Sequence, residues 1–439
     1  MQRAGFRRNG PTRSRATRRQ EQKRPLFILA VPLAAATLLA AGCGSGGAEN
    51  TTDPSTSAAS VDAVLGAPDP ATGDPVKIGM ISDGKAPTSD TSVEGRVADA
   101  TVEWINARRG GLGGRPIQLV TCEALADPAK AADCGNRMVE ENVVAVVFGG
   151  PAFPDAAWQP LHDAHIPTMF YANSSPALLA DPETFVLADP IFSVIGLPIS
   201  VAKEKGVKKV TAVVIDLPAA VGIYQNQAPP IFTEAGVDLN LVAIPPDQAD
   251  MTPQMQRIAT DGTGLVFVVG GAAFCTAAFN GLHAVGYTGT VVSITQCLGE
   301  DTAKVVPGSV LAGMTVGAQA PVGTDDPSFR LFSEVSRTYG DDIDLNSGVA
   351  IGMFTSMAGF RDALEGISPT DLTPAGIAAT ITKMPEKPLP GAGGVRFRCN
   401  GKADPALPAV CVRGGLATTL DDKGKPTTYQ ALGQSSIPG

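Results

Sequence analysis

Short apolar runs alternate with amphipathic stretches along most of the chain, a pattern that predicts alternating strands and helices. The run at 76–81 is followed at 91–107 by apolar residues at helical spacing, which end in Arg-Arg-Gly-Gly, a helix stop signal. At 143–148 every residue is apolar, as in a parallel strand covered on both faces. Further strands are predicted at 117–121 and 167–171, and further helices at 156–164 and after Asp127-Pro128, an aspartate cap with proline in the first turn.

The same alternation starts again at residue 210. Strands are predicted at 210–215, 237–244, 265–269 and 291–294, and helices at 220–235, 252–260 and 276–285. Three more helices follow at 328–339, 347–365 and 374–383, and a last β segment is predicted around 395–412. Two series of alternating strands and helices indicate an α/β protein with two doubly wound parallel sheets, one in each of two lobes.

The N-terminal 43 residues have the layout of an export signal. Residues 1–24 are basic, residues 25–42 are apolar and uncharged, and Cys43 follows. The ending Leu-Leu-Ala-Ala-Gly-Cys resembles a bacterial lipobox, although Ala40 stands where leucine is commoner. We therefore expect a signal peptide at 1–43 and lipidation of Cys43, whose acyl chains would hold the protein on the extracytoplasmic face of the cell membrane. An uncleaved membrane helix is the alternative.

Composition and charge exclude several classes of protein. Nine basic residues and one acidic residue give the first 43 residues a charge of +8, and because the whole chain carries −9, the remainder carries −17. An acidic body of this kind lacks the cationic surface that nucleic-acid binding needs, so no nucleic-acid partner is predicted. A hydrophobic fraction of 44% excludes a disordered chain. Beyond the N-terminus there is no long apolar run, which excludes a multi-span membrane protein.

Glycine, serine, threonine and proline are frequent at 44–74, which is predicted to be a flexible tether. Six cysteines beyond Cys43 fall into three close couples: Cys122 with Cys134, Cys275 with Cys297, and Cys399 with Cys411. An even number in an exported chain is typical of disulfides, so we predict the local pairing among the fifteen possible ones. Free thiols are the alternative. A zinc site is disfavoured because there is no CxxC pair, and three histidines also make a His-based metal site improbable.

Several segments resemble the type I periplasmic solute-binding proteins of the branched-chain amino-acid (Leu/Ile/Val-binding) family of ABC transporters. The resemblance covers about 75–439 and is carried by VKIGMIS, VEWINARRGGLGGRPIQLV, LADPAKAADCGNRMVEENVVAVVFGG, IPTMFYANSSPAL, GVKKVTAVVID and GLVFVVGG. It implies one lobe at 75–190 plus 318–390 and a second at 191–317 plus 391–439, joined by a hinge of three crossing strands. In the family, a small solute is captured in the cleft between the lobes and passed to the transmembrane permease of an ABC importer.

The cleft is expected at the carboxyl ends of both sheets, so candidate ligand contacts follow the ends of the strands. The candidates are Asp83, Lys85, Thr91, Ser92, Gly150, Pro151, Ala152, Phe153, Asn173 and Ser174 in the first lobe, and Ala220, Val221, Ala272 and Gln296 in the second. The resemblance implies that the loop at 149–153 offers backbone N–H groups to a ligand carboxylate. It also implies that Ser174 helps to hold an amino-acid head group.

Two departures from the amino-acid-binding pattern affect the expected solute. The position of the second-lobe carboxylate that pairs with a ligand ammonium is taken by Gln296 or the adjacent Cys297. Aromatic cleft residues are replaced by small ones at Ala220 or Val221 and at Ala272. A buried ammonium without a carboxylate is costly, so we expect a larger solute that is neutral or anionic, with Lys85 available to pair an anion.

Structural roles are the alternative for several candidates. In that interpretation Asp83 and Lys85 are solvated turn residues, Phe153 is a core residue, Ser174 caps the helix that begins near Pro176, and Gln296 makes a structural hydrogen bond. An enzyme is disfavoured because the chain carries no GxSxG or HExxH motif, and no catalytic residue, metal or cofactor is predicted. We expect a monomeric binding protein of an ABC importer. A ligand-sensing receptor domain of the same fold, signalling to a membrane partner, is the second functional interpretation.

Overall fold

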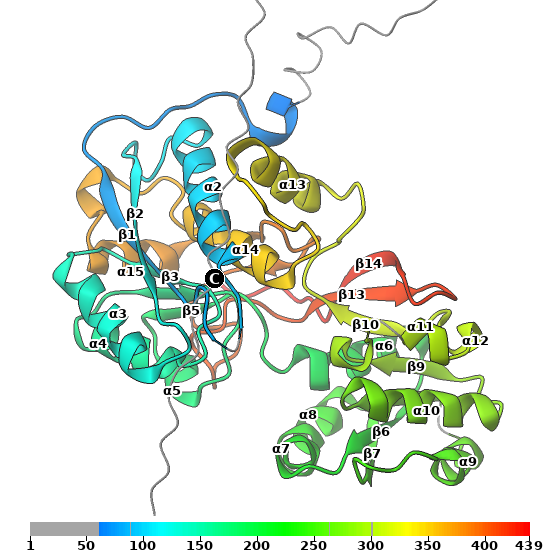
Figure 1. The fold of residues 1–439 in the computed structure, drawn as a ribbon. Helices are drawn as coiled ribbons and strands as arrows, with labels where there is room; N and C mark the ends of the chain where they lie inside the picture. Colours follow the sequence, from blue (N-terminus) through cyan, green and yellow to red (C-terminus); the bar gives the residue numbers. More distant parts are fainter. Residues whose placement is uncertain (1–60, 88, 263, 300–301) are drawn as a thin grey trace, which may run out of the picture. The chain divides into compact units, whose positions relative to one another are not determined.

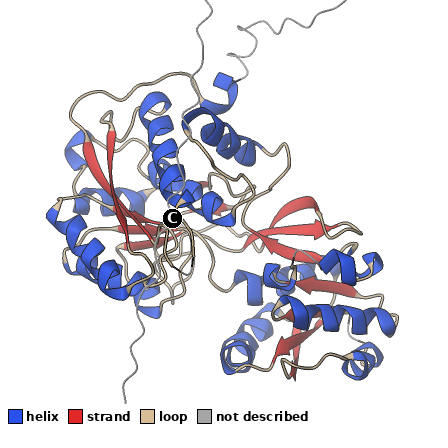
Figure 2. Ribbon diagram, viewed as in Figure 1, coloured by secondary structure: helices blue, strands red, loops and turns tan. Residues whose placement is uncertain are grey.

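The computed structural model describes residues 61–439 apart from residues 88, 263, 300 and 301. The described residues form two α/β lobes, and in each of them helices pack against a central sheet (Figure 1, Figure 2). The α/β class with parallel sheets in two lobes, predicted from the alternating pattern, is therefore confirmed. The predicted leader at 1–43, including Cys43, lies outside the described residues.

The sheet of the first lobe is parallel throughout and has the strand order β2-β1-β3-β4-β5. Its strands are β1 (Val76–Ser82), β2 (Ile117–Glu123), β3 (Val146–Phe148), β4 (Thr168–Phe170) and β5 (Thr184–Val186). Its helices are α2 (Val93–Arg108), α3 (Pro128–Glu140), α4 (Pro154–Asp163), α5 (Pro176–Ala180), α13 (Pro327–Tyr339), α14 (Gly348–Ala363), the short η4 (Pro369–Asp371) and α15 (Pro374–Lys383). Helices α2, α13 and α14 pack together as one layer, and α3 and α4 pack together as another.

The sheet of the second lobe has the order β14-β13-β10-β9-β8-β6-β7. Its parallel strands are β6 (Lys209–Ile215), β7 (Asp238–Ile244), β8 (Leu265–Val269), β9 (Thr290–Ser293) and β10 (Thr315–Ala318). The hairpin of β13 (Gly415–Leu420) and β14 (Pro426–Leu432) joins the edge in antiparallel register, with Thr315 opposite Thr419. The predicted last β segment at 395–412 is confirmed in part, since the short strand at Arg396–Phe397 and isolated bridges at Val410 and Val412 lie within it. The longer C-terminal strands, which begin at Gly415, were not predicted.

Helical segments of the second lobe begin with η1 (Phe192–Gly196), α6 (Leu197–Lys205), α7 (Pro218–Gly222), η2 (Ile223–Gln227) and α8 (Ala228–Ala235). They continue with α9 (Thr252–Thr260), α10 (Ala272–Ala284), η3 (Thr295–Cys297), α11 (Thr302–Val305) and α12 (Gly308–Leu311). The single helix predicted at 220–235 is thus divided by the π turn η2. Pro229 and Pro230 follow that turn and have no N–H to donate, which favours a change of helical geometry there.

Each lobe has its own hydrophobic core, and the chain passes between the two cores four times within the described residues. The first three passages lie between Leu187 and Phe192, between Val316 and Ala320, and between Val412 and Ala417. The segment from Ala392 to Val412 packs in the first core, to which Phe397 of the short strand β12 (Arg396–Phe397) belongs. β12 pairs with the short strand β11 (Lys387–Pro388). This differs from the predicted boundary, which assigned everything after residue 390 to the second lobe.

The fourth passage is made by the C-terminal tail. Leu432 ends β14 in the second core, whereas Ile437 is buried in the first core. The Asn400 side chain donates to the Pro438 carbonyl at 2.7 Å, and the Arg413 guanidinium donates to the Ser436 carbonyl at 2.9 Å. The tail therefore returns to the first lobe, where Figure 1 marks the C-terminus.

Residues 61–74 are folded onto the first lobe, in contrast to the predicted tether. Residues 61–65 are helical, and Leu65 is buried in the first core. The indole Nε1 of Trp104 donates to the Leu65 carbonyl at 2.9 Å, and the Arg108 guanidinium donates to the Gly66 carbonyl at 2.7 Å. The chain is anchored here because its backbone carbonyls accept hydrogen bonds from side chains of α2. The rest of the predicted tether, 44–60, lies outside the described residues.

The three predicted disulfides are confirmed. Cys122 bonds to Cys134 and Cys399 bonds to Cys411 within the first lobe, and Cys275 bonds to Cys297 within the second. The predicted cap of α3 is also confirmed, since the Asp127 carboxylate accepts hydrogen bonds from the backbone N–H groups of Ala129 and Lys130.

Candidate functional site

A cavity of about 880 Å³ lies beside the segments that cross between the lobes, and residues of both lobes line it. Tyr171 and Ala172, at the carboxyl end of β4, line it from the first lobe. Thr295 and Gln296, at the carboxyl end of β9, line it from the second. In open parallel sheets, ligands bind outside the carboxyl ends of the strands, which makes this cavity the candidate solute site.

The lining of the cavity is mainly apolar, and Asp189 is the single charged side chain among the described residues that line it. Its carboxylate accepts hydrogen bonds from the backbone N–H of Ile191 at 3.0 Å and of Gly414 at 3.3 Å. Asp189 therefore ties the first crossing segment to the third. Burial raises the pKa of Asp189, and these two N–H groups partly oppose that rise.

Tyr171 and Gln296 supply polar groups from opposite sides of this cavity. Burial raises the pKa of Tyr171 to about 12, so its hydroxyl stays neutral at physiological pH. Gln296 is exposed, and its Oε1 atom accepts a hydrogen bond from the Thr295 hydroxyl at 3.3 Å. Both side chains are suited to hydrogen bonding with a solute. Tyr171 was not among the predicted contacts, although its position directly after an apolar strand is the signal that could have found it.

Gln296 alone among the fourteen predicted ligand contacts lines the cavity. Asn173 and Ser174 follow Ala172 but do not line it, and the Asn173 side chain accepts from the Ser175 backbone N–H at 2.7 Å. Ser174 is not the helix cap that the alternative interpretation made it, because the N-cap position of α5 belongs to Ser175. In the second lobe, Ala220 is half-buried and Val221 is packed in the core, while Ala272 opens α10.

The predicted residues after β1 bond mainly to one another and to the backbone. Asp83 is only 3% exposed, so it is not a solvated turn residue. The Lys85 side chain is 80% exposed and lies 3.9 Å from the Asp90 carboxylate. The Thr91 hydroxyl donates to the Gly84 carbonyl at 3.3 Å, and the Ser92 hydroxyl donates to Asp90 at 2.6 Å.

The loop between β3 and α4 holds Gly150, Pro151, Ala152 and Phe153. Gly150 and Ala152 are exposed, Pro151 is buried, and Phe153 is 41% exposed, so Phe153 is not a core residue. In the second lobe, Leu217 lies at the start of α7, after the carboxyl end of β6, and is 46% exposed. It was not predicted as a contact. Apolar side chains are thus exposed at the carboxyl ends of both sheets.

Glu94 is a buried carboxylate that sequence reasoning missed. It lies in the first turn of α2 and is 2% exposed. Its Oε1 accepts from the Gly150 backbone N–H at 2.7 Å, and its Oε2 has no hydrogen-bond partner among the described residues. Burial raises its pKa to about 7, although the Gly150 N–H and the Thr91 hydroxyl lower it. A glutamate in a first helical turn is ordinary, so the sequence carries no signal of this burial.

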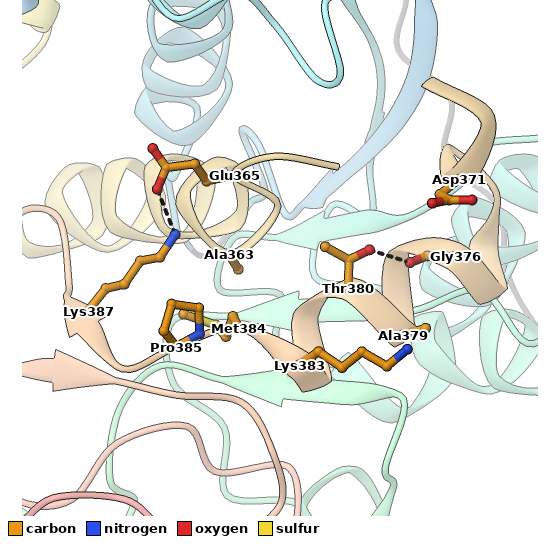
Figure 3. A pocket seen from close by; sticks show the side chains of 10 residues that line it. All are labelled: Ala363, Glu365, Asp371, Gly376, Ala379, Thr380, Lys383, Met384, Pro385 and Lys387. Carbon is orange, nitrogen blue, oxygen red and sulfur yellow. Dashed lines mark hydrogen bonds and ion pairs between the residues drawn. The ribbon is translucent and has the colours of Figure 1, made fainter. Parts of the chain in front are cut away.

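A second cavity, of about 420 Å³, lies on the first lobe around α15 (Figure 3). Its polar groups are largely paired with one another or with the backbone. The Lys387 ammonium is 2.9 Å from the Glu365 carboxylate, and the Thr380 hydroxyl donates to the Gly376 carbonyl at 2.8 Å. It is not at the carboxyl ends of the sheet strands, so it is not the candidate solute site.

Two features are absent from the described part of the chain. Within it, no three His, Cys, Asp or Glu side chains are grouped so that they would hold a metal ion. Nor does that part contain a helix with the length and apolar character needed to cross a membrane.

Two parallel-sheet lobes with a cavity at the ends of their strands define the class of two-lobed solute-binding folds. Within that class, the chain belongs to the periplasmic binding protein family, because the family model described as "Periplasmic binding protein" matches residues 75–416. The resemblance found in the sequence is thereby confirmed. Members of this family act outside the cytoplasm. No curated protein matches the sequence significantly.

Solved structures show the same fold at low sequence identity. A putative branched-chain amino acid ABC transporter from Rhodospirillum rubrum has a TM-score of 0.68 and 15% identity, over 81% of this chain and 99% of that chain. A protein of the same description from Silicibacter pomeroyi has a TM-score of 0.61 and 18% identity, over 82% and 96% of the two chains. An ABC transporter solute-binding protein from R. palustris, in complex with 4-hydroxybenzoate, has a TM-score of 0.56 and 20% identity, over 82% and 98%.

Proposed function

We propose that this protein is the substrate-binding component of an ABC importer, which captures a small solute and releases it unchanged to a transmembrane permease. The observation that carries the proposal is the cavity of about 880 Å³, lined from both lobes at the carboxyl ends of β4 and β9. The descriptions of the similar structures support the same function, since all three name an ABC transporter and the one from R. palustris names a solute-binding protein.

Capture would use relative movement of the lobes. The solute first binds one lobe, and the crossing segments bend as the other lobe closes over it. Tyr171 and Gln296 would approach the solute from opposite sides, while Asp189 keeps two of the crossing segments in register. A solute shifts the protein from open to closed only by its difference in affinity for the two states, so contacts from both lobes are needed.

Lipidation of Cys43 would keep the protein at the membrane that holds its permease. Acyl chains are sufficient for this, and residues 44–60 would connect the anchor to the folded part of the chain. The protein would act as a monomer on the extracytoplasmic face. Mass spectrometry of the N-terminal peptide of the exported protein tests this: a lipid-modified Cys43 supports the anchor, and an unmodified peptide that begins upstream of it contradicts the anchor.

Solute capture is tested on the exported protein carrying Cys43→Ser, which removes the lipid. Native mass spectrometry identifies molecules retained through purification, and a thermal-shift screen covers a library of small metabolites. A solute at 100 times its dissociation constant stabilises the folded protein by about 2.7 kcal/mol, which such a screen detects. Failure to find any retained molecule or any shift would contradict the proposal. Chemical conversion of the retained molecule would favour an enzyme instead.

A further inference from the structure

The candidate solute cavity does not end at the carboxyl ends of the strands but continues along one face of the second sheet. β13 and β14 extend that sheet beyond β10 (Figure 1). Leu416, Thr418 and Leu420 all line the cavity, and because side chains alternate along a strand, every second residue of β13 faces it. Successive residues of an antiparallel strand rise about 3.4 Å, so the steps from Leu416 to Leu420 cover roughly 14 Å.

The neighbouring strands add residues to the same face. In the pair of β10 and β13, Val316 stands opposite Thr418 and Ala318 stands opposite Leu416. In the pair of β13 and β14, Tyr429 stands opposite Thr418. Residues that stand opposite each other in an antiparallel pair lie on the same face of the sheet, and all of these residues line the cavity. We call this surface the β13 wall; it consists of Val316, Ala318, Leu416, Thr418, Leu420 and Tyr429.

The two hydroxyl groups of the β13 wall already donate within the protein. The Thr418 hydroxyl donates to the Thr428 carbonyl at 2.8 Å, and the Tyr429 hydroxyl donates to the Val322 carbonyl at 3.1 Å. The other four side chains of the wall are aliphatic. A polar group of a solute would lose its bonds to water at this wall without finding a free donor, whereas an apolar group would gain free energy by leaving water. The wall therefore favours apolar groups.

Polar groups that a solute could use lie at the other end of the same cavity. Tyr171 and Gln296 supply a hydroxyl and an amide at the carboxyl ends of β4 and β9, and Gln319 supplies a second amide directly after β10. Ala318, the last residue of β10, belongs to the β13 wall, so the polar end adjoins the wall. The cavity volume of about 880 Å³ lies in the upper part of the range of about 300–1,000 Å³ that is typical of ligand sites. One cavity thus combines a hydrogen-bonding end with a long apolar surface.

We propose that the β13 wall is a subsite for an extended apolar chain, so that the solute is a single-chain amphipathic molecule with a hydrogen-bonding head at Tyr171 and Gln296. The inference rests on the proposed function of solute capture and names the class of solute. The family match ends at residue 416, so Thr418, Leu420 and Tyr429 lie beyond it. A compact solute would leave most of the wall without a partner.

The first test is a chain-length series on the exported Cys43→Ser protein. Straight-chain primary amides from butanamide to dodecanamide are titrated by calorimetry, with leucine as a compact comparison, and molecules retained through purification are identified by native mass spectrometry. We expect the affinity to rise by roughly twofold to fourfold for each added CH₂ group, because each one is removed from water. The rise should stop once the chain is longer than the wall, and leucine should bind more weakly than the longest amide that binds.

The outcomes of this series separate the inference from the proposed function. An affinity that does not depend on chain length, or a compact solute as the tight ligand, would overturn the inference and leave solute capture intact. Retention of a two-chain membrane lipid would overturn it as well. If no molecule is retained and none binds, the proposed function fails and this inference fails with it.

The second test places a charge at the far end of the wall. Pro426 is exposed, lines the cavity and stands opposite Leu420, so Pro426→Asp puts a carboxylate beside the end of a bound chain. Thr428→Asp is the matched control, because Thr428 is exposed on the same strand but stands opposite Thr419 and does not line the cavity. We expect Pro426→Asp to weaken the longest amide that binds by about tenfold and the shortest by less than about twofold. The control should change neither affinity.

Gln296→Ala tests the position of the head. It should weaken amides of every length by the same factor, because it removes a contact to the head and none to the chain. A loss confined to the long amides would contradict the proposed orientation. If Pro426→Asp folds, as circular dichroism would show, and its chain-length dependence stays that of the parent protein, the inference is wrong. If it does not fold, the series on the Cys43→Ser protein decides.

Discussion

The two lobes present different chemistry at the carboxyl ends of their sheets. In the first lobe, buried Asp83 and Glu94 bond the backbone of the β3–α4 connection. In the second lobe, α7 and α10 open with uncharged, mostly small residues, and Leu217 is exposed. The first edge is thus fixed by internal hydrogen bonds before any solute binds, whereas the second offers apolar surface. Because the first lobe is already ordered, less conformational entropy is lost there when a solute binds. The contacts that can adjust to the solute then come from the second lobe.

The largest expected effect is on the second lobe. Cys275→Ser combined with Cys297→Ser removes the link between α10 and η3, which closes a loop with a sequence separation of 22. The loss is expected to be roughly 3.5 kcal/mol in the free energy of unfolding, because the unfolded chain regains entropy. Urea unfolding measures it. The same change at Cys122 and Cys134, which are separated by 12, should lower the free energy of unfolding by roughly 3 kcal/mol. A much larger loss there would mean that the first lobe, and not the second, depends more on its disulfide.

Glu94 should make the first lobe sensitive to pH. Burial raises its pKa from 4.5 to about 7, so the folded protein favours the neutral acid. This stabilising preference is complete below pH 4.5 and is lost as the pH rises through 7. The free energy of unfolding of the wild type, relative to Glu94→Gln, should therefore fall by about 3 kcal/mol between pH 4 and pH 8. Urea melts across this range measure the difference, and a flat difference curve contradicts the burial of Glu94. Glu103→Gln, at an exposed position on the same helix, should track the wild type throughout.

Glycines in the corresponding loops of the two lobes should differ in tolerance. Gly149→Ala forces the Glu94 carboxyl away from its bond to Gly150, at a cost of about 1–3 kcal/mol. At Gly271 a Cβ would meet no described atom within 4 Å, so Gly271→Ala should cost less than about 1 kcal/mol. Thermal unfolding of both variants compares them. In a Glu94→Ala background the cost of Gly149→Ala should shrink, and an unchanged cost would show that another contact is responsible.

The smallest expected effect is at Lys85. Its ion pair with Asp90 is exposed, so Lys85→Ala should change the free energy of unfolding by less than about 1 kcal/mol. Solute affinity, measured by calorimetry on whichever molecule the protein retains, should also stay within twofold of the wild type. A tenfold loss would restore Lys85 as the partner of an anionic solute and would weaken the contrast between the lobes.

Regular patterns made much of the fold predictable. The predicted bounds 252–260, 265–269 and 374–383 agree with α9, β8 and α15, because each has a clear apolar period and clear end signals. β5 was not predicted, although it has the same three-residue length as β3 and β4. The hairpin of β13 and β14 was missed because its strands alternate weakly and follow a long irregular segment.

The candidate site was predictable only in outline. Strand ends can be read from the sequence, and Gln296 was found that way. The roles of Asp83 and Glu94 depend on backbone N–H groups 69 and 56 residues away, and nothing local specifies such pairs. Likewise, the sequence gives no sign that residues 61–74 bind along α2 through Trp104 and Arg108.

The returning C-terminal tail sets a geometric limit on the molecule. Leu432 is fixed in one core and Ile437 in the other, so five peptide links span the interval between them. A fully extended chain covers at most about 3.6 Å per residue, which confines these two anchoring points to within roughly 18 Å of each other. A larger separation of the two anchoring points would first have to pull Ile437 out of its core. The number of residues in the tail therefore sets the largest opening that leaves both cores intact.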